Sequence, residues 1–268
     1  MKYKVITLDI DGTLTNSEKV ITENTKKALL DFQEKGGKII LASGRPQHSM
    51  FPYAETLALK KYGGYILAYN GSCVIDCKTG NMMFRQTLDR GYIPEICGII
   101  KNYPVGIGAY QEDNMIVGNS VNRYTRNASQ RNHLNIIYVE NFAEYVDFDI
   151  YKCLLQGEPE IISELECILS EKYKDKLGVF KSEPFFLEIV PNGIDKAYTL
   201  DRLLKMTGFS TDECIACGDG FNDISMIKYA GLGVAMGNAP DTVKKSADFI
   251  TLSNDLDGIA FLLEKISV

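Results

Sequence analysis

Short apolar runs alternate with amphipathic segments over both ends of the chain. The first run, at residues 5–8 of a predicted strand over 3–10, is apolar on both faces, as in a covered parallel sheet. Further strands are predicted over 38–42, 65–69, 213–217, 231–235 and 248–252. Helices are predicted over 22–35, 195–206, 222–230 and 256–266, and another is expected to open at Pro46. This alternation predicts a parallel sheet with right-handed crossovers.

Residues with cap and turn preferences mark the ends of these elements. Thr22 is a suitable N-cap for the first helix, and Gly36 and Gly37 follow its end. Asn70 and Gly71 predict a turn after the strand over 65–69, and residues 78–80 predict a second turn between strand-like runs.

The pattern changes between about residues 82 and 187. A helix is expected near 88–102, followed by strand-like runs near 105–110, 113–117 and 149–156, a helix over 159–173, and strands over 177–181 and 184–190. We therefore expect an α/β core formed by residues 1–81 and 188–268, with an α+β domain inserted over 82–187.

Charge and composition exclude some classes of function. Lys and Arg together number 29 against 35 Asp and Glu, a net charge of −6, which disfavours a sequence-independent grip on nucleic acid. A small anionic substrate remains compatible with this balance, because the local field matters more than the net charge. No apolar run is long enough for a membrane-spanning helix or a signal peptide, so we expect a cytoplasmic protein.

The seven cysteines are expected to be reduced and packed. Cys214 and Cys217 have the spacing of a metal or redox pair, but they lie in a run typical of a buried strand. A zinc site would need two further ligands, and the two histidines, His48 and His133, lie far away along the chain.

An acidic motif, Asp9-Ile10-Asp11-Gly12-Thr13, ends the first predicted strand. Ligand sites of open α/β sheets lie at the carboxyl edge of the strands. Two carboxylates about 4 Å apart repel each other by roughly 4 kcal/mol at an effective dielectric constant of 20, so a cation or a shared proton must offset the repulsion. Taken alone, the motif is equally consistent with an Asx-rich turn that closes a strand.

A second acidic motif, Gly218-Asp219-Gly220-Phe221-Asn222-Asp223, follows another apolar strand and opens a helix. Asp219 is expected at the same sheet edge as the first motif, whereas Asp223 or Asn222 could instead cap the helix. Three or four carboxylates at one edge, with no histidine nearby, predict a site for a hard cation, and oxygen ligands favour Mg²⁺.

Two further positions are suited to binding an anion. Ser43-Gly44-Arg45 ends the second predicted strand, where a hydroxyl and a backbone N–H ahead of a helix can hold a phosphate. The alternative interpretation of Ser43 is a helix cap. Lys196 lies in a first helical turn, where the helix dipole disfavours a cation, so a bound anion or the carboxylates explain it better than solvent does.

In this order and spacing, the four motifs resemble those of the haloacid dehalogenase-like (HAD) phosphatases. The run over 230–239 and the place of the insertion, between the second and third motifs, resemble the Cof-type, class IIB branch. The resemblance covers residues 1–81 and 188–268 and implies a Rossmann-like core with an inserted α/β cap that selects the substrate. One departure is Ala197, where relatives often have glycine.

The resemblance also implies a role for each motif residue. Asp9 would be the nucleophile that becomes an aspartyl phosphate, and Asp11 would protonate the leaving oxygen and then take a proton from water. Mg²⁺ would be held by Asp9, the backbone carbonyl of Asp11, Asp219 and, directly or through water, Asp223. The phosphate would meet the backbone N–H groups of Ile10 and Gly44, the Ser43 hydroxyl, Lys196 and Asn222. Thr13 would order the first loop.

The implied activity is hydrolysis of phosphomonoesters of small metabolites, with sugar phosphates foremost. A sugar phosphomutase or phosphotransferase would use the same intermediate, and a non-catalytic sugar-phosphate sensor would bind without turnover. Every chemical position is present, which argues against the non-catalytic sensor. Contacts to the leaving group are expected in the inserted domain, and the candidates there and just after the second motif are Tyr110, Arg123, Arg126, His133 and His48.

Overall fold

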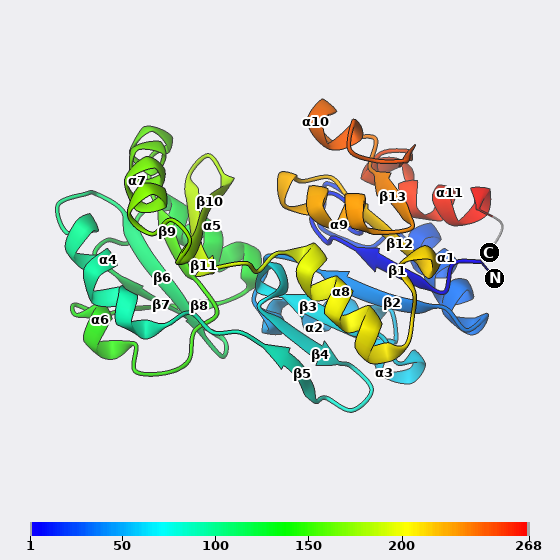
Figure 1. The fold of residues 1–268 in the computed structure, drawn as a ribbon, viewed down its shortest axis with the longest axis horizontal. Helices are drawn as coiled ribbons and strands as arrows, with labels where there is room; N and C mark the ends of the chain where they lie inside the picture. Colours follow the sequence, from blue (N-terminus) through cyan, green and yellow to red (C-terminus); the bar gives the residue numbers. More distant parts are fainter. Residues whose placement is uncertain (1, 267–268) are drawn as a thin grey trace. The chain divides into compact units, whose positions relative to one another are not determined.

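The structure is a computed structural model that describes residues 2–266, and it contains two compact units (Figure 1). The first unit takes the chain up to residue 85 and from residue 195 onward, and the second is residues 86–194. The sequence placed these boundaries a few residues earlier, at 82 and 187. Strand β11 (Phe186–Pro191) therefore lies wholly within the second unit.

The first unit is built on one sheet, whose strands lie in the order β14-β13-β12-β1-β2-β3-β4-β5. Neighbours from β14 to β3 are parallel, as the alternation of strands and helices predicts, while β4 and β5 continue the sheet in antiparallel pairing. The strands are β1 (Val5–Leu8), β2 (Lys38–Ala42), β3 (Tyr65–Ala68), β4 (Cys73–Asp76), β5 (Met82–Arg85), β12 (Cys214–Gly218), β13 (Leu232–Ala235) and β14 (Phe249–Ile250).

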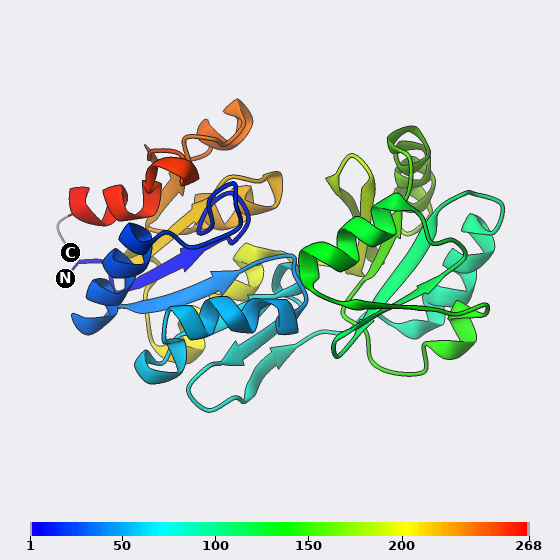
Figure 2. The same cartoon turned by 180° about the vertical axis from the view of Figure 1, so that it is seen from behind.

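Helices cover both faces of this sheet. Helices α8 and α9 lie in front of it in Figure 1, and α1 and α2 lie in front of it in the reverse view of Figure 2. The helices of this unit are α1 (Glu23–Glu34), α2 (Phe51–Thr56), α3 (Leu59–Tyr62), α8 (Lys196–Thr207), α9 (Ile224–Tyr229), α10 (Asp241–Lys244) and α11 (Gly258–Lys265). The helix expected at Pro46 begins as a short 3-10 turn, Gln47–Met50, and α10 was not predicted.

Capping residues mark the start of α1 and the end of α8. The Thr22 side chain accepts a hydrogen bond from the backbone N–H of Thr25 at the start of α1. Gly208 adopts a left-handed conformation, with φ of 78°, at the end of α8. At the start of α8 the side chain of Asp195 accepts from the backbone N–H of Tyr198, and this cap fixes the position of Lys196, the first residue of the helix.

Buried aliphatic side chains join the helices to the sheet. Leu200 and Leu203 of α8 pack in one cluster with Val5, Ile40 and Cys214 of the central strands. Both Cys214 and Cys217 are free thiols, buried within β12. The interpretation of this pair as core packing is therefore confirmed.

The second unit holds another sheet, with the strand order β10-β11-β9-β6-β7-β8. Its pairs are antiparallel except for β7 with β8. One face packs on α4, α6 and α7, and α5 covers the other face (Figure 2). Besides β11, the elements are β6 (Gly106–Gln111), β7 (Asn114–Gly118), β8 (Asn135–Tyr138), β9 (Cys153–Gln156), β10 (Leu177–Glu183), α4 (Ile93–Ile100), α5 (Arg123–Asn132), α6 (Phe142–Tyr145) and α7 (Pro159–Lys172).

Three of these elements, α5, β8 and α6, were missed in the sequence. Helix α5 buries only small or polar side chains, namely Thr125, Ala128 and Ser129, so it has no apolar stripe to signal a helix. Within the described part of the chain, every helix is too short or too polar to span a bilayer.

Candidate active site

The first and second acidic motifs meet because their strands are neighbours. Strand β1 lies between β12 and β2 and pairs with both in parallel, so that Leu8 is level with Cys217 and Leu41. The residues that follow these strands therefore emerge together at the carboxyl edge of the sheet. Asp9, Asp219 and Ser43 are each within two residues of a strand end.

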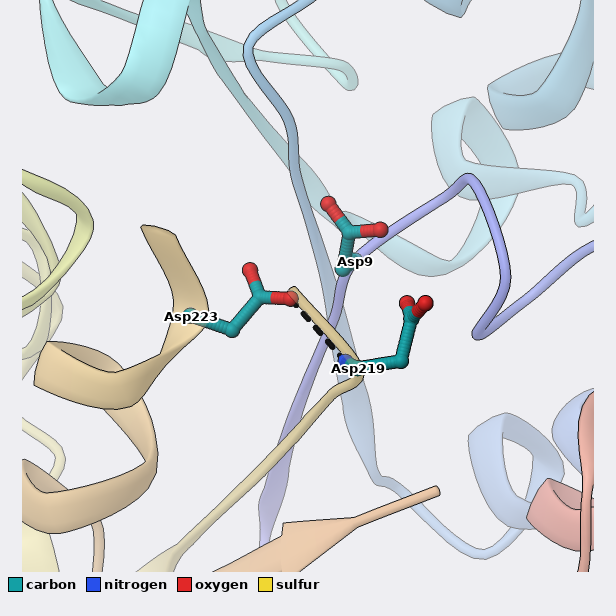
Figure 3. Close-up of side chains that lie close together, drawn as sticks. All are labelled: Asp9, Asp219 and Asp223. Carbon is teal, nitrogen blue, oxygen red and sulfur yellow. Dashed lines mark hydrogen bonds between the residues drawn. The ribbon is translucent and has the colours of Figure 1, made fainter. Parts of the chain in front are cut away.

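Three carboxylates gather at this edge. Asp9, Asp219 and Asp223 each offer an oxygen that lies within 4.8 Å of the other two (Figure 3). The Nζ of Lys196 lies 2.6 Å from Oδ1 of Asp9 and 2.5 Å from Oδ1 of Asp223, and its side chain is completely buried. The sequence expected either an anion or the carboxylates beside this lysine, and in the structure its partners are the carboxylates.

The cluster carries more negative than positive charge, and its titration reflects that excess. Burial and the charge of Asp223 raise the pKa of Asp9, and Lys196 acts in the opposite direction. The same two causes, burial and Asp223, raise the pKa of Asp219 to about 6. Burial lowers the pKa of Lys196, but the charges of Asp223 and Asp9 outweigh it and keep the lysine protonated.

Asp223 connects the cluster to the loop after β12. Its Oδ2 accepts hydrogen bonds from the backbone N–H groups of Asp219, at 3.0 Å, and Gly220, at 2.8 Å. Figure 3 shows the first of these as a dashed line. With Oδ1 on Lys196, both oxygens of Asp223 are engaged. Asp223 is the N-cap residue of α9, but its side chain makes no cap bond to that helix. It holds the loop before the helix instead and also belongs to the charged cluster.

Asp11 lies outside the group of three carboxylates. Arg45 donates to it from Nε at 2.6 Å and from Nη2 at 2.9 Å, and the Nζ of Lys19 lies 3.0 Å from its Oδ1. Burial raises the pKa of Asp11, but the hydrogen bonds and charges of Arg45 and Lys19 outweigh it and hold the pKa well below its usual range. Asp11 is therefore ionised at neutral pH.

Small residues and short polar contacts hold the loop after β1 against the loop after β12. Gly12 has a φ of 83°, and a Cβ at this position would lie 2.3 Å from Oδ2 of Asp219, so a side chain would displace the loop or the carboxylate. The hydroxyl of Thr13 donates to Oδ1 of Asp219 at 2.8 Å, in keeping with the loop-ordering role expected for it. Asn238 donates to the backbone carbonyl of Gly12 at 2.9 Å.

The residues expected to bind phosphate come from loops at the same edge. Ile10 follows Asp9 directly, and Ser43 and Gly44 follow β2. The Ser43 hydroxyl is buried and accepts from the backbone N–H of Arg45 at 3.3 Å, so Ser43 is not the cap of the next helical turn. The Nδ2 of Asn222 donates to Oδ1 of Asn70 at 3.0 Å, which places Asn70 beside the second acidic motif.

Sequence reasoning missed the partners that these loops supply. Lys19 and Arg45 reach Asp11 across the loops, and Asn238 supports Gly12 from a distant segment. From its sequence context, Asn70 is predicted only to form a turn. Its position after a buried strand also places it at the carboxyl edge of the sheet, and this could have marked it as a site residue.

The candidate substrate contacts are scattered. Arg123 is exposed and bonded to Glu158, Arg126 and His133 are exposed, and Tyr110 is buried beneath Lys152. His48, in the first unit, packs edge-on against Phe51. No arrangement among the described residues singles out one of these five.

The whole length of the chain matches known proteins. The family model of the haloacid dehalogenase-like hydrolases matches residues 6–263. The 5-amino-6-(5-phospho-D-ribitylamino)uracil phosphatase YcsE of Bacillus subtilis is 31% identical over 257 residues, which cover 96% of this chain and 93% of that protein.

Solved structures show the same fold. A haloacid dehalogenase-like hydrolase from Bacteroides thetaiotaomicron is 42% identical, with a TM-score of 0.93 over 99% of this chain and 100% of that one. The HAD subclass IIB sugar phosphatase BT4131 is 26% identical, with a TM-score of 0.85 over 98% of this chain and 99% of that one.

Proposed function

This chain belongs to the haloacid dehalogenase-like hydrolase family and is an enzyme of its phosphatase branch, and on that premise we propose that it is a Mg²⁺-dependent hydrolase of small phosphate monoesters, sugar phosphates foremost. The observation that carries the proposal is the cluster of Asp9, Asp219 and Asp223 around a fully buried Lys196. This site combines a nucleophile, oxygen ligands for a metal and a fixed cation for a phosphoryl oxygen.

The residues of the cluster fit a divalent cation. All of its donors are carboxylate oxygens, which Mg²⁺ prefers, and their three charges exceed that of Lys196 by two. Asp9, Asp219 and the backbone carbonyl of Asp11 are the proposed ligands. Because both oxygens of Asp223 already accept hydrogen bonds, we assign it contact through water. Bound Mg²⁺ would lower the pKa of Asp9 and neutralise charge on the phosphoryl group.

Asp9 is the proposed nucleophile. Lys196 holds its Oδ1 at 2.6 Å and so fixes the orientation of the carboxylate. Attack on phosphorus forms a bond to an Asp9 oxygen while the bond to the leaving oxygen breaks, which gives an aspartyl phosphate. Water then attacks phosphorus, and orthophosphate and the Asp9 carboxylate are released.

Asp11 is the proposed acid and base of these two steps. Its low pKa suits the second step, in which an ionised carboxylate takes a proton from the attacking water. In the first step it must donate a proton to the leaving oxygen. Its bonds to Arg45 and Lys19 oppose that protonation, so we expect them to break or weaken when substrate binds.

The phosphoryl oxygens would be met by groups that the structure brings to one edge. These are the backbone N–H groups of Ile10 and Gly44, the Ser43 hydroxyl, Lys196 and Asn222. Transfer of a phosphoryl group requires mainly positioning and neutralised charge, and this set offers both.

We assign the choice of substrate to the inserted unit, residues 86–194. The chain leaves and re-enters the first unit at residues 85 and 195, and the re-entry point is directly followed by Lys196. Exchange of residues 86–194 for the matching segment of a relative is expected to change the order of substrates by kcat/KM. The dependence on Mg²⁺ should stay the same, because its ligands lie in the first unit.

The test is release of phosphate from a panel of phosphate esters, with Mg²⁺ and with EDTA. The panel holds sugar phosphates, nucleotides, FMN, pyridoxal phosphate and 5-amino-6-(5-phospho-D-ribitylamino)uracil, the compound named for the B. subtilis relative. Turnover should vanish with EDTA and in Asp9→Asn, and should persist in the control Asp31→Asn, which changes an exposed carboxyl of α1. A folded protein that hydrolyses nothing in the presence of Mg²⁺ would refute the proposal.

A further inference from the structure

Asn70 is locked in place between the loops of the candidate site. It follows β3, and its backbone N–H donates to the carbonyl of Ser43 at 3.0 Å. The next residue, Gly71, accepts a hydrogen bond through its carbonyl from the hydroxyl of Thr199 at 2.8 Å, one turn after the start of α8. The turn at Asn70 is thus fixed both to the loop after β2 and to the helix that begins at Lys196.

The side-chain amide of Asn70 is buried and only half used. Its Oδ1 accepts from Asn222, but its Nδ2 has no hydrogen-bond partner among the described residues, although the residue is only 4% exposed. The amide lies against Gly44, where a Cβ would come within 3.1 Å of both Oδ1 and Nδ2. A buried N–H without a partner is unfavourable and rare in folded proteins.

The backbone of Asn70 adds a second unfavourable feature. Its φ is 56°, in the left-handed region that glycine adopts most readily. A turn alone would be served better by glycine, which has neither the strain nor the buried amide. The side chain is therefore expected to have a use beyond forming the turn.

We propose that the Nδ2 of Asn70 donates a hydrogen bond to an oxygen of the phosphoryl group. Asn222 occupies the other end of the amide and so orients the Nδ2 hydrogens toward the anion, beside the Ser43–Gly44 loop. The ligand class is a tetrahedral oxyanion: the phosphate of the ester substrate or orthophosphate itself. This assignment rests on the proposed function, which it extends by one phosphate-binding residue.

The test measures binding of orthophosphate, which needs no turnover. Asn70→Gly removes the amide and keeps the left-handed backbone accessible, and Asn70→Asp keeps the shape but replaces the donor by an anionic oxygen. The matched control is Ala58→Gly, because Ala58 also has a positive φ, of 51°, in the same unit, and lies in none of the loops of the site. Affinity for orthophosphate is measured by calorimetry at saturating Mg²⁺, and KM and kcat are measured with the best ester.

Both Asn70 variants should bind orthophosphate about tenfold or more weakly, since a hydrogen bond to a charged group is lost, with the larger loss in Asn70→Asp. Ala58→Gly should bind it like the wild type. Orthophosphate affinity that is unchanged in Asn70→Gly, with only a lower Tm, would show a structural role and overturn the assignment. If the wild type hydrolyses no ester but its affinity for orthophosphate depends on Asn70, the proposed function fails and the assignment stands.

Discussion

Asp219→Asn should make the metal-free protein more stable and the Mg²⁺-bound protein less stable. Asp219 lies in the carboxylate cluster without an ion pair to any residue that the structure describes, since Lys196 bonds to Asp9 and Asp223 instead. Its bonds come from the hydroxyl of Thr13 and, at 3.4 Å, from Asn238. The Thr13 bond can persist to the amide oxygen of the variant, so the substitution changes mainly the charge.

The magnitude follows from the pKa shift of Asp219 and from the charge repulsion that contributes to this shift. A carboxyl whose pKa rises from 3.8 to about 6 on folding destabilises the folded protein at pH 7 by about 3 kcal/mol. Repulsion from one carboxylate at 4.8 Å, the upper limit of the oxygen separations in the cluster, amounts to about 3.5 kcal/mol at an effective dielectric constant of 20. The two values agree, so removal of this charge should raise the free energy of unfolding by about 3 kcal/mol.

The difference in stability between Asp219→Asn and the wild type depends on pH. Because its pKa is raised in the folded state, Asp219 binds more protons in the folded than in the unfolded protein between pH 3.8 and about 6. The stability that protonation contributes is complete below pH 3.8 and is lost as the pH rises through about 6. The variant has no titrating group here, so the difference between the proteins should be near zero below pH 3.8 and complete by pH 7.

Urea denaturation in EDTA and in Mg²⁺, at several pH values, measures all of these quantities. With Mg²⁺ the wild type should gain stability by mass action, and the variant should gain much less because a ligand is missing. The reasoning is refuted if the variant is no more stable than the wild type in EDTA at pH 7. Equal gains from Mg²⁺ in the two proteins would show that Asp219 does not bind the metal.

Three further changes test other parts of the site and the core. Lys196→Met leaves Asp9 and Asp223 without their buried cation. A denaturation curve at pH 7 should therefore show a free energy of unfolding that is lower by about 3–5 kcal/mol. A loss below about 1 kcal/mol would contradict the ion-pair geometry. Arg45→Met removes the main partner of Asp11, so the pKa of that carboxyl should rise. The alkaline limb of the kcat/KM profile, which reports the acid that protonates the leaving oxygen, should then move to higher pH, whereas an unmoved limb would show that Asp11 is not the group titrating there. Buried thiols such as Cys214 should resist alkylation at pH 8 in the native protein, because burial raises the pKa of Cys214 to about 12. The exposed Cys167 should react under the same conditions, and mass spectrometry distinguishes the two.

The positions of the charged motifs could be predicted because each is fixed by short-range signals. A strand buried on both faces ends where polar residues begin, and the parallel sheet then brings those ends to one edge. For Asp9 and Asp219 this reasoning needs only the pattern of neighbouring residues. Lys196 was placed by the helix predicted over 195–206, and in the structure Asp195 caps that helix by accepting from the N–H of Tyr198.

The partners of those residues could not be predicted, because they depend on how loops lie in three dimensions. Asp11 receives Lys19 from farther along its own loop and Arg45 from the next one, and nothing in the spacing of these residues signals the pairing. The contacts of the Asn70 amide could not be predicted for the same reason. Its sequence context predicts a turn correctly, but the unused Nδ2 is visible only in the packed structure.

Mg²⁺ and orthophosphate should bind cooperatively, because neither charge suits the site alone. With its three carboxylates ionised, the cluster of Asp9, Asp219, Asp223 and Lys196 carries a charge of −2, so an anionic phosphate meets net repulsion until a divalent cation neutralises the cluster. Linkage then requires each ligand to raise the affinity for the other by the same factor, roughly 5- to 150-fold for typical coupling free energies. Calorimetric titration of each ligand with and without the other measures both factors. In Asp219→Asn the cluster carries one negative charge less, so orthophosphate should bind better without metal and the coupling should shrink. Independent binding of the two ligands to the wild type would mean that the cation does not occupy the carboxylate cluster.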